Sequence, residues 1–166
     1  VLPGMRERGD GHILNISSIG AQTFPPRFAA YVASKAALDA FSRCLAPEVA
    51  ADGVAITEIH MPLVRTPMIA PTGLYKNFPT ISPDEAAGMV VQAIISRPNE
   101  VSTRLGKFGQ ITNAVAPGLS QLIMGAACRM RPDSAPRDGE QREKKEDAPV
   151  SVEAYALGQL MRGIHL

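Results

Sequence analysis

The sequence predicts an α/β fold in which helices cover both faces of a parallel sheet. Three consecutive segments support this prediction: an apolar run over 12–17, a long alanine-rich segment over 29–51, and a second apolar run over 54–61. Strand, helix and strand in this order form a βαβ unit, in which the two strands pair in parallel. At 166 residues the chain is long enough for one domain with a substantial core.

The expected elements of this unit have recognisable starts and stops. The run GHILNISS follows a Gly-Asp-Gly break, and short apolar runs between turns are typical of strands buried in a parallel sheet. The helix over 29–51 carries Val32, Leu38 and Phe41 at mostly helical spacing, so we expect it to be largely buried. Gly53 ends this helix, and the β-branched residues of VAITEIHM indicate the next strand.

The second half of the chain begins with a proline-rich stretch, 62–81, which predicts a long loop. Ser82, Pro83 and Glu85 are an N-cap, a first-turn proline and a capping-box acid, and they predict a helix that ends at Arg97. A short strand is expected over 100–106. The mostly apolar stretch 108–130 is interrupted by Pro117 and Gly118, which predicts two helical pieces.

Four regions follow from this organisation. Residues 1–106 form part of the α/β domain, 107–131 an apolar helical extension, 132–149 a charged disordered linker around REKKED, and 150–166 a C-terminal helix. The apolar extension could cover a substrate tunnel, lie on a membrane surface, or pack on the core or a partner subunit. These alternatives stay open at the level of sequence.

Composition excludes several classes of function. A formal charge of +1 gives no attraction to nucleic acid, and Cys44 and Cys128 lie too far apart for a metal-ligand motif, so we expect no metal site. The N-terminal stretch lacks the apolar core of a signal peptide, and no apolar run is long enough to span a membrane. We interpret the protein as cytoplasmic, with peripheral membrane contact as an alternative.

Three side chains suggest a reaction. Tyr31 and Lys35 are spaced i and i+4 in AAYVASKAALDAF, so on a helix they share one face, and Ser18 ends the first strand. The lysine ammonium can stabilise a tyrosinate, and the serine hydroxyl can donate a hydrogen bond to a carbonyl oxygen as negative charge develops there. The set suits carbonyl reduction by hydride transfer, with the tyrosine as proton donor.

The text around these residues resembles a known family. GHILNISS followed by AAYVASKAALDAFSRCLAPEVA is similar to the catalytic segment of short-chain dehydrogenases/reductases, which implies a Rossmann-like sheet and homo-oligomers. The resemblance implies catalytic roles for Ser18, Tyr31 and Lys35, and cofactor contacts for Tyr31 and Lys35. Ser17 is the less favoured serine because its spacing is off by one, and Asn15 receives no catalytic role.

The resemblance continues after the second strand, with one departure. Family members usually have Pro-Gly there, followed by a backbone group and a threonine that contact the nicotinamide amide; here Met61 and Pro62 replace Pro-Gly. The cofactor contacts then align with Val64 and Thr66. A proline in place of glycine removes a donor and stiffens the turn, so this contact can differ in detail.

Four further segments resemble a narrower group, the bacterial fatty acyl-CoA reductases. These segments are MPLVRTPMIAPT, PTISPDEAA, STRLG and LMRGIHL. This implies NADPH as cofactor, with NADH as the alternative, and a lipid substrate, an acyl-CoA or fatty aldehyde, reduced to aldehyde or alcohol. Two other interpretations remain: a reductase of another lipid-like ketone, such as a 3-oxoacyl or mycolate-type precursor, and a catalytically idle interaction module.

No glycine-rich motif for a dinucleotide pyrophosphate occurs in the sequence. We therefore expect that motif upstream of Val1, and we interpret the sequence as the C-terminal fragment of a longer reductase. We expect this fragment alone neither to bind dinucleotide tightly nor to turn over, and to expose one edge of its sheet.

Overall fold

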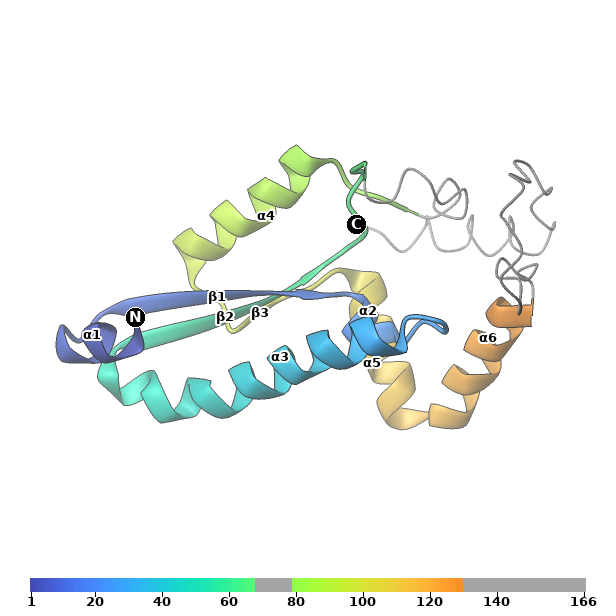
Figure 1. Cartoon of the computed structure of the whole chain (residues 1–166), viewed down its shortest axis with the longest axis horizontal. Helices are drawn as coiled ribbons and strands as arrows, with labels where there is room; N and C mark the ends of the chain where they lie inside the picture. Colours follow the sequence, from blue (N-terminus) through green and yellow to red (C-terminus); the bar gives the residue numbers. More distant parts are fainter. Residues whose placement is uncertain (68–78, 130–166) are drawn as a thin grey trace, which may run out of the picture.

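The computed structural model describes residues 1–67 and 79–129, and it contains a parallel sheet in the order β1-β2-β3 (Figure 1). Strand β1 (Gly11–Ser18) pairs with β2 (Val54–Met61) along its whole length, from Gly11 opposite Val54 to Ser18 opposite Met61. The short β3 (Glu100–Val101) pairs with the middle of β2. Both expected strands of the βαβ unit are therefore confirmed.

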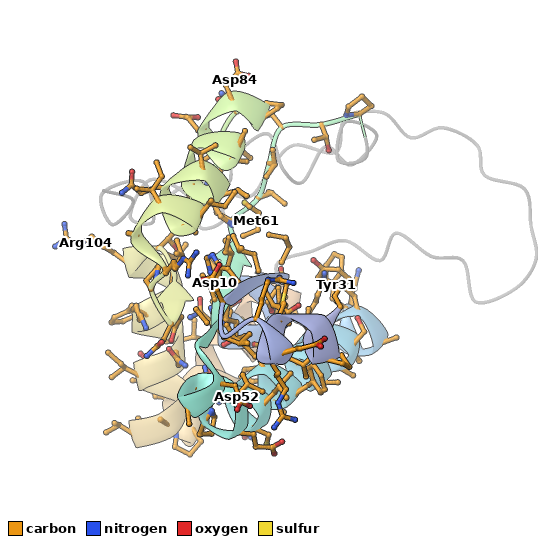
Figure 2. All side chains as sticks on the ribbon, turned by 90° about the vertical axis from the view of Figure 1, so that its left-hand side faces the viewer. Asp10, Tyr31, Asp52, Met61, Asp84 and Arg104 are labelled. Carbon is orange, nitrogen blue, oxygen red and sulfur yellow. The ribbon has the colours of Figure 1, made fainter. Side chains whose placement is uncertain are left out.

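Helices lie on both faces of this sheet. Helix α3 (Ala29–Val49) connects β1 to β2 on one face, and α4 (Pro83–Ser96) lies on the other (Figure 1). Figure 2 shows the same layering end-on, with Asp52, which follows α3, and Asp84, in α4, on opposite sides of the sheet. The expected fold class, a parallel sheet wound on both faces, is confirmed.

The remaining helices are short or belong to the extension. They are α1 (Leu2–Glu7), α2 (Gly20–Thr23), the 3₁₀ turn η1 (Ala50–Asp52), α5 (Arg104–Val115) and α6 (Pro117–Arg129). The break between α5 and α6 occurs where the sequence predicts it, because Pro117 is the first residue of the new helix. In the extension, large apolar side chains are exposed at Phe108, Ile111, Val115, Leu119 and Leu122.

Local capping explains the boundaries of two helices. The Ser82 hydroxyl accepts a hydrogen bond from the Glu85 N–H, and the Glu85 carboxylate accepts one from the Ser82 N–H, which confirms the capping box. The expected strand over 100–106 is wrong beyond Val101. The Thr103 hydroxyl accepts a hydrogen bond from the Gly106 N–H at 3.2 Å, so it caps α5 and turns the chain into a helix.

Helix α3 is less buried than its apolar pattern predicts. Val32 and Val49 face the sheet and are buried, but Phe41 is 58% exposed. A helix on one face of a sheet buries only the stripe that contacts the strands, and Phe41 lies outside that stripe. Polar Asp39 and Ser42 occupy buried positions instead.

The apolar core lies where α3 ends and β2 begins. Val49, Val54 and Ile56 are buried together, and Leu2 and Met5 of α1 pack against them. Gly53 makes the turn between α3 and β2 with φ of 73°, a backbone conformation that side chains disfavour. A Cβ at this position would collide with the Gly9 carbonyl oxygen.

Several expectations concern other parts of the chain. Three of the expected segments lie wholly or mostly outside the described residues. They are the charged linker over 132–149, the C-terminal helix over 150–166 and most of the proline-rich loop over 62–81. Within the described residues, no helix combines the length and apolar character needed to cross a membrane.

Candidate active site

Ser18 lies at the carboxyl end of β1, directly before the short helix α2. Its hydroxyl accepts a hydrogen bond from the Gly20 N–H at 3.1 Å, and the residue is 8% exposed. A Cβ on Gly20 would lie 3.3 Å from Ser18 Oγ and 3.6 Å from Tyr31 Cε1. The serine hydroxyl and the tyrosine ring therefore flank the same small space beside Gly20.

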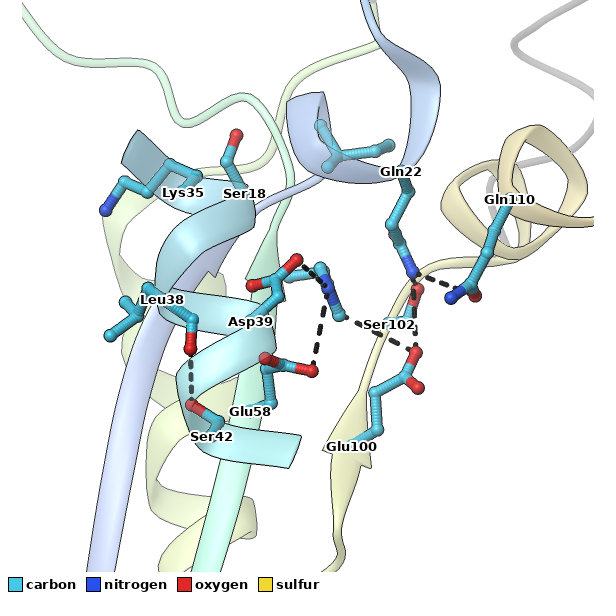
Figure 3. Close-up of polar contacts among 12 residues, drawn as sticks. Ser18, Gln22, Lys35, Leu38, Asp39, Ser42, Glu58, Glu100, Ser102 and Gln110 are labelled. Carbon is cyan, nitrogen blue, oxygen red and sulfur yellow. Dashed lines mark hydrogen bonds and ion pairs between the residues drawn. The ribbon is translucent and has the colours of Figure 1, made fainter. Parts of the chain in front are cut away.

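Tyr31 and Lys35 come from the first turns of α3, one turn apart as the sequence predicts. Tyr31 is 48% exposed, so solvent reaches its ring. The Lys35 ammonium donates a hydrogen bond to the Ile16 carbonyl oxygen at 2.9 Å. Figure 3 shows the Ser18 hydroxyl and the Lys35 ammonium pointing in different directions. The contacts around Gly20 bring the Ser18 hydroxyl near the Tyr31 ring, whereas Lys35 is held against β1.

The neighbouring serine has a different setting. Ser17 is 2% exposed, and its Oγ has no hydrogen-bond partner among the described residues. Successive side chains of a strand point to opposite faces, so Ser17 and Ser18 cannot both face Tyr31. Asn15 donates a hydrogen bond to the Ser42 hydroxyl at 2.8 Å, which ties β1 to α3 beneath the candidate site.

Val64 and Thr66 follow β2 after the departure at Met61 and Pro62. Val64 forms a parallel bridge with Ile81, in which the Ile81 N–H donates to the Leu63 carbonyl and the Arg65 N–H donates to the Ile81 carbonyl, both at 2.9 Å. This bridge does not use the N–H of Val64 itself. Thr66 is half-buried, close to the end of the described stretch 1–67.

A group of ionisable side chains that the sequence analysis did not single out lies below this site, between α3 and β2. His60 Nε2 is 3.0 Å from Asp39 Oδ2 and 4.0 Å from Glu58 Oε2 (Figure 3). A signal was present, because Glu58 and His60 alternate within the strand VAITEIHM, which is otherwise mostly apolar and expected to be buried. We call Asp39, Glu58 and His60 the buried triad.

Burial and the neighbouring Asp39 carboxylate raise the pKa of Glu58 from 4.5 to about 7, against an opposing effect of the Arg43 guanidinium. The Arg43 Nε donates to Glu58 Oε2 at 3.4 Å. The carboxyl of Glu58 therefore keeps its proton to a higher pH than an exposed carboxyl does.

Comparison with known proteins gives several matches. Residues 1–75 match the family model described as short chain dehydrogenase. A fatty acyl-CoA reductase from Acinetobacter baylyi is 52% identical over 143 residues, covering 86% of this chain and 48% of that protein. An uncharacterized oxidoreductase from Mycobacterium tuberculosis is 43% identical over 164 residues, covering 99% of this chain and 48% of that protein.

A solved structure also matches. The crystal structure of a short-chain dehydrogenase from Streptomyces avermitilis is 26% identical with a TM-score of 0.59, covering 77% of this chain and 55% of that one. The chain spans about half the length of the curated relatives it matches. Family model, relatives and fold agree, and the chain belongs to the short-chain dehydrogenase family.

Proposed function

We propose that this chain contributes the proton-donating part of an NAD(P)H-dependent oxidoreductase that reduces long-chain fatty acyl-CoA to aldehyde or alcohol. The observation that carries the proposal is the approach of Ser18 and Tyr31 around Gly20, at the carboxyl end of a strand in a parallel sheet. Ligands of open α/β sheets bind outside the carboxyl ends of the strands. A donor hydroxyl and a phenol at this place suit one carbonyl oxygen.

The described residues fit one end of a nicotinamide cofactor. The N–H of Val64 is not used by the bridge to Ile81 and can donate to a carboxamide, with Thr66 two residues further on. Lys35 and Tyr31 would contact the ribose from α3. We propose NADPH as the cofactor, with NADH as the alternative, and the cofactor supplies the hydride.

Three side chains of this chain then act on the carbonyl oxygen of the substrate and on the proton that it receives. The Ser18 hydroxyl donates a hydrogen bond to the substrate carbonyl oxygen, and Tyr31 donates a second bond or transfers its proton. The Lys35 ammonium, on the same helical face, stabilises the tyrosinate that remains. With an acyl thioester, Ser18 and Tyr31 hold the oxyanion of a hemithioacetal, which collapses when the CoA thiolate leaves.

The substrate class is supported by similarity alone. The Acinetobacter baylyi relative is named for fatty acyl-CoA reduction, and it is 52% identical to this chain over 143 residues. A reductase of a 3-oxoacyl or mycolate-type ketone would use the same three side chains, so product analysis must separate the two. The exposed apolar side chains of α5 and α6 suit an acyl chain, a membrane surface or a partner subunit equally.

The test uses the complete polypeptide in which this sequence occurs. NADPH oxidation is measured with palmitoyl-CoA and with a β-ketoacyl thioester, and the products are identified by mass spectrometry. Tyr31→Phe and Ser18→Ala are expected to lower kcat by about 10² or more, because a positioned proton donor contributes about that much. Ser17→Ala is the matched control and should retain turnover.

Four outcomes would contradict parts of the proposal. Equal turnover by Tyr31→Phe and the wild type would show that Tyr31 is not the proton donor, and no turnover by the wild type would favour the idle interaction module. Loss of activity in Ser17→Ala but not in Ser18→Ala would assign the catalytic role to Ser17 instead of Ser18. Turnover of the β-ketoacyl thioester alone would keep the family chemistry and replace the substrate.

A further inference from the structure

One face of β2 changes character halfway along the strand. Val54 and Ile56 point to the α3 side and join the apolar core, whereas Glu58 and His60, at the next positions of the same alternation, are buried and ionisable. Asp39 of α3 faces them from the covering helix. A fold of this size rarely buries two carboxyls and an imidazole together unless something neutralises them.

The buried triad offers metal-ligand atoms at suitable separations. His60 Nε2 is 3.0 Å from Asp39 Oδ2 and 4.0 Å from Glu58 Oε2, and one ligand atom from each residue lies within 4.8 Å of the others. Ligands about 2.0–2.2 Å from one ion lie roughly 3–4 Å apart, so small side-chain shifts suffice. Imidazole with carboxylates is a donor set that zinc accepts in proteins.

Several polar atoms of the buried triad lack partners within the described structure. Glu58 Oε1 and Asp39 Oδ1 are buried and accept no hydrogen bond from the described residues while both carboxyls are ionised, whereas a proton on Glu58 lets the two carboxyls hydrogen-bond each other. Arg43 contacts the other oxygen of Glu58, Oε2, from the rim. Buried carboxylate oxygens are nearly always satisfied, so these two atoms indicate a missing cation or proton.

The second nitrogen of His60 faces a further carboxylate. His60 Nδ1 is fully buried, has no hydrogen-bond partner among the described residues, and is 3.6 Å from Glu100 Oε1 on β3. The Glu100 carboxylate forms an ion pair with the Lys107 ammonium. It also accepts a hydrogen bond from the Gln22 amide (Figure 3). A carboxylate near the distal nitrogen is the usual support of a metal-binding histidine. A cation at Nε2 would replace the hydrogen bond that this nitrogen makes with Asp39.

We propose that Asp39, Glu58 and His60 form a binding site for a first-row divalent cation, with zinc as the first candidate. The cation neutralises the charges of Asp39 and Glu58, while Lys107 balances Glu100. Arg43 is 55% exposed at its side chain, so water solvates its charge at the rim. A bound cation would join α3 to β2 directly below the helical turn that carries Lys35.

The test measures zinc binding by the full chain. Zinc per chain is counted by mass spectrometry after gel filtration, and titration calorimetry measures the affinity for zinc. The Cys44→Ser/Cys128→Ser double variant is the background, because Cys44 is exposed and both thiols could bind zinc. We expect one zinc per chain in this background and weaker binding of magnesium, which prefers oxygen ligands.

Variants assign the site. Asp39→Asn, which keeps the side-chain shape, and His60→Gln should each lower zinc affinity by at least about tenfold, and Glu100→Gln by about tenfold through its effect on His60. The exposed Glu48→Gln is the control and should bind as the background does. Circular dichroism checks that each variant folds. If His60→Gln does not fold, the zinc affinity of Asp39→Asn alone tests the assignment.

Two results would overturn the proposal. If the cysteine-free background binds no zinc, the buried triad holds protons only. If Asp39→Asn binds zinc as tightly as the background, the ion sits elsewhere. Neither outcome bears on reductase activity, which is measured separately.

Discussion

The replacement Glu58→Gln tests the buried triad through the pH dependence of stability. Glutamine keeps the size of the side chain and removes its titration. In the folded chain, burial and Asp39 raise the pKa of Glu58 from 4.5 to about 7. The folded state therefore holds this proton more tightly than the unfolded state, and the difference stabilises the fold at low pH.

The sign and size of this effect on stability follow from the linkage between proton binding and folding. The contribution of Glu58 is fully present below the unfolded pKa of 4.5 and is lost as the pH rises through about 7. At about 1.36 kcal/mol for each pKa step, this amounts to about 3 kcal/mol for a single, independent carboxyl. Coupling to Asp39 makes this an upper value. The free energy of unfolding of Glu58→Gln should therefore rise relative to that of the wild type between about pH 5 and about pH 8.

Urea unfolding at several pH values measures both proteins, with a chelator present so that no cation replaces the proton. The exposed Glu48→Gln variant shows how much of the pH dependence comes from a surface carboxylate. Parallel stability curves for Glu58→Gln and the wild type would refute the reasoning. Glu58 would then titrate in the folded chain as it does in the unfolded one.

Three further replacements test how local structure is held, each by urea unfolding. Ser82→Ala removes the hydroxyl that caps α4 and should cost about 1 kcal/mol, and no change would mean that α4 does not need its cap. Gly53→Ala should cost more than about 1 kcal/mol, because its φ is 73° and its new methyl would meet Gly9; a smaller loss would mean that the turn relaxes. Asn15→Ala removes the 2.8 Å bond to Ser42 and should cost about 1–3 kcal/mol; the double variant with Ser42→Ala should cost less than the sum of the single variants if the bond is real.

Local signals predicted much of the fold. The helix cap at Ser82, the break at Pro117 and the strand over 54–61 each depend on a few adjacent residues, so their sequence determines them. The strand expected over 100–106 ends at Val101, because the Thr103 hydroxyl caps α5. This cap is also a local signal. The burial of individual α3 side chains could not be predicted from periodicity, because a helix on one face of a sheet buries only the stripe that contacts the strands and leaves Phe41 in solvent.

Part of the candidate site was also within reach of the sequence. Helical geometry by itself places Tyr31 and Lys35 one turn apart on the same face. Whether Ser18 approaches Tyr31 depends on how β1, α2 and α3 pack, and the close contacts around Gly20 show that it does. The hydrogen bond from Lys35 to Ile16 likewise depends on how α3 sits on β1.

The sequence alone determined that this chain contains a βαβ unit with a tyrosine and a lysine on one helical face, because strand and helix periodicity are local properties. Only the tertiary structure decided that Asp39, Glu58 and His60 meet, with Glu100 behind them. These residues come from α3, β2 and β3, and the parallel register of the strands together with the seating of α3 on the sheet brings them together. No sequence spacing encodes that register, so the sequence shows two ionisable residues in a buried strand but not that Asp39 and Glu100 meet them.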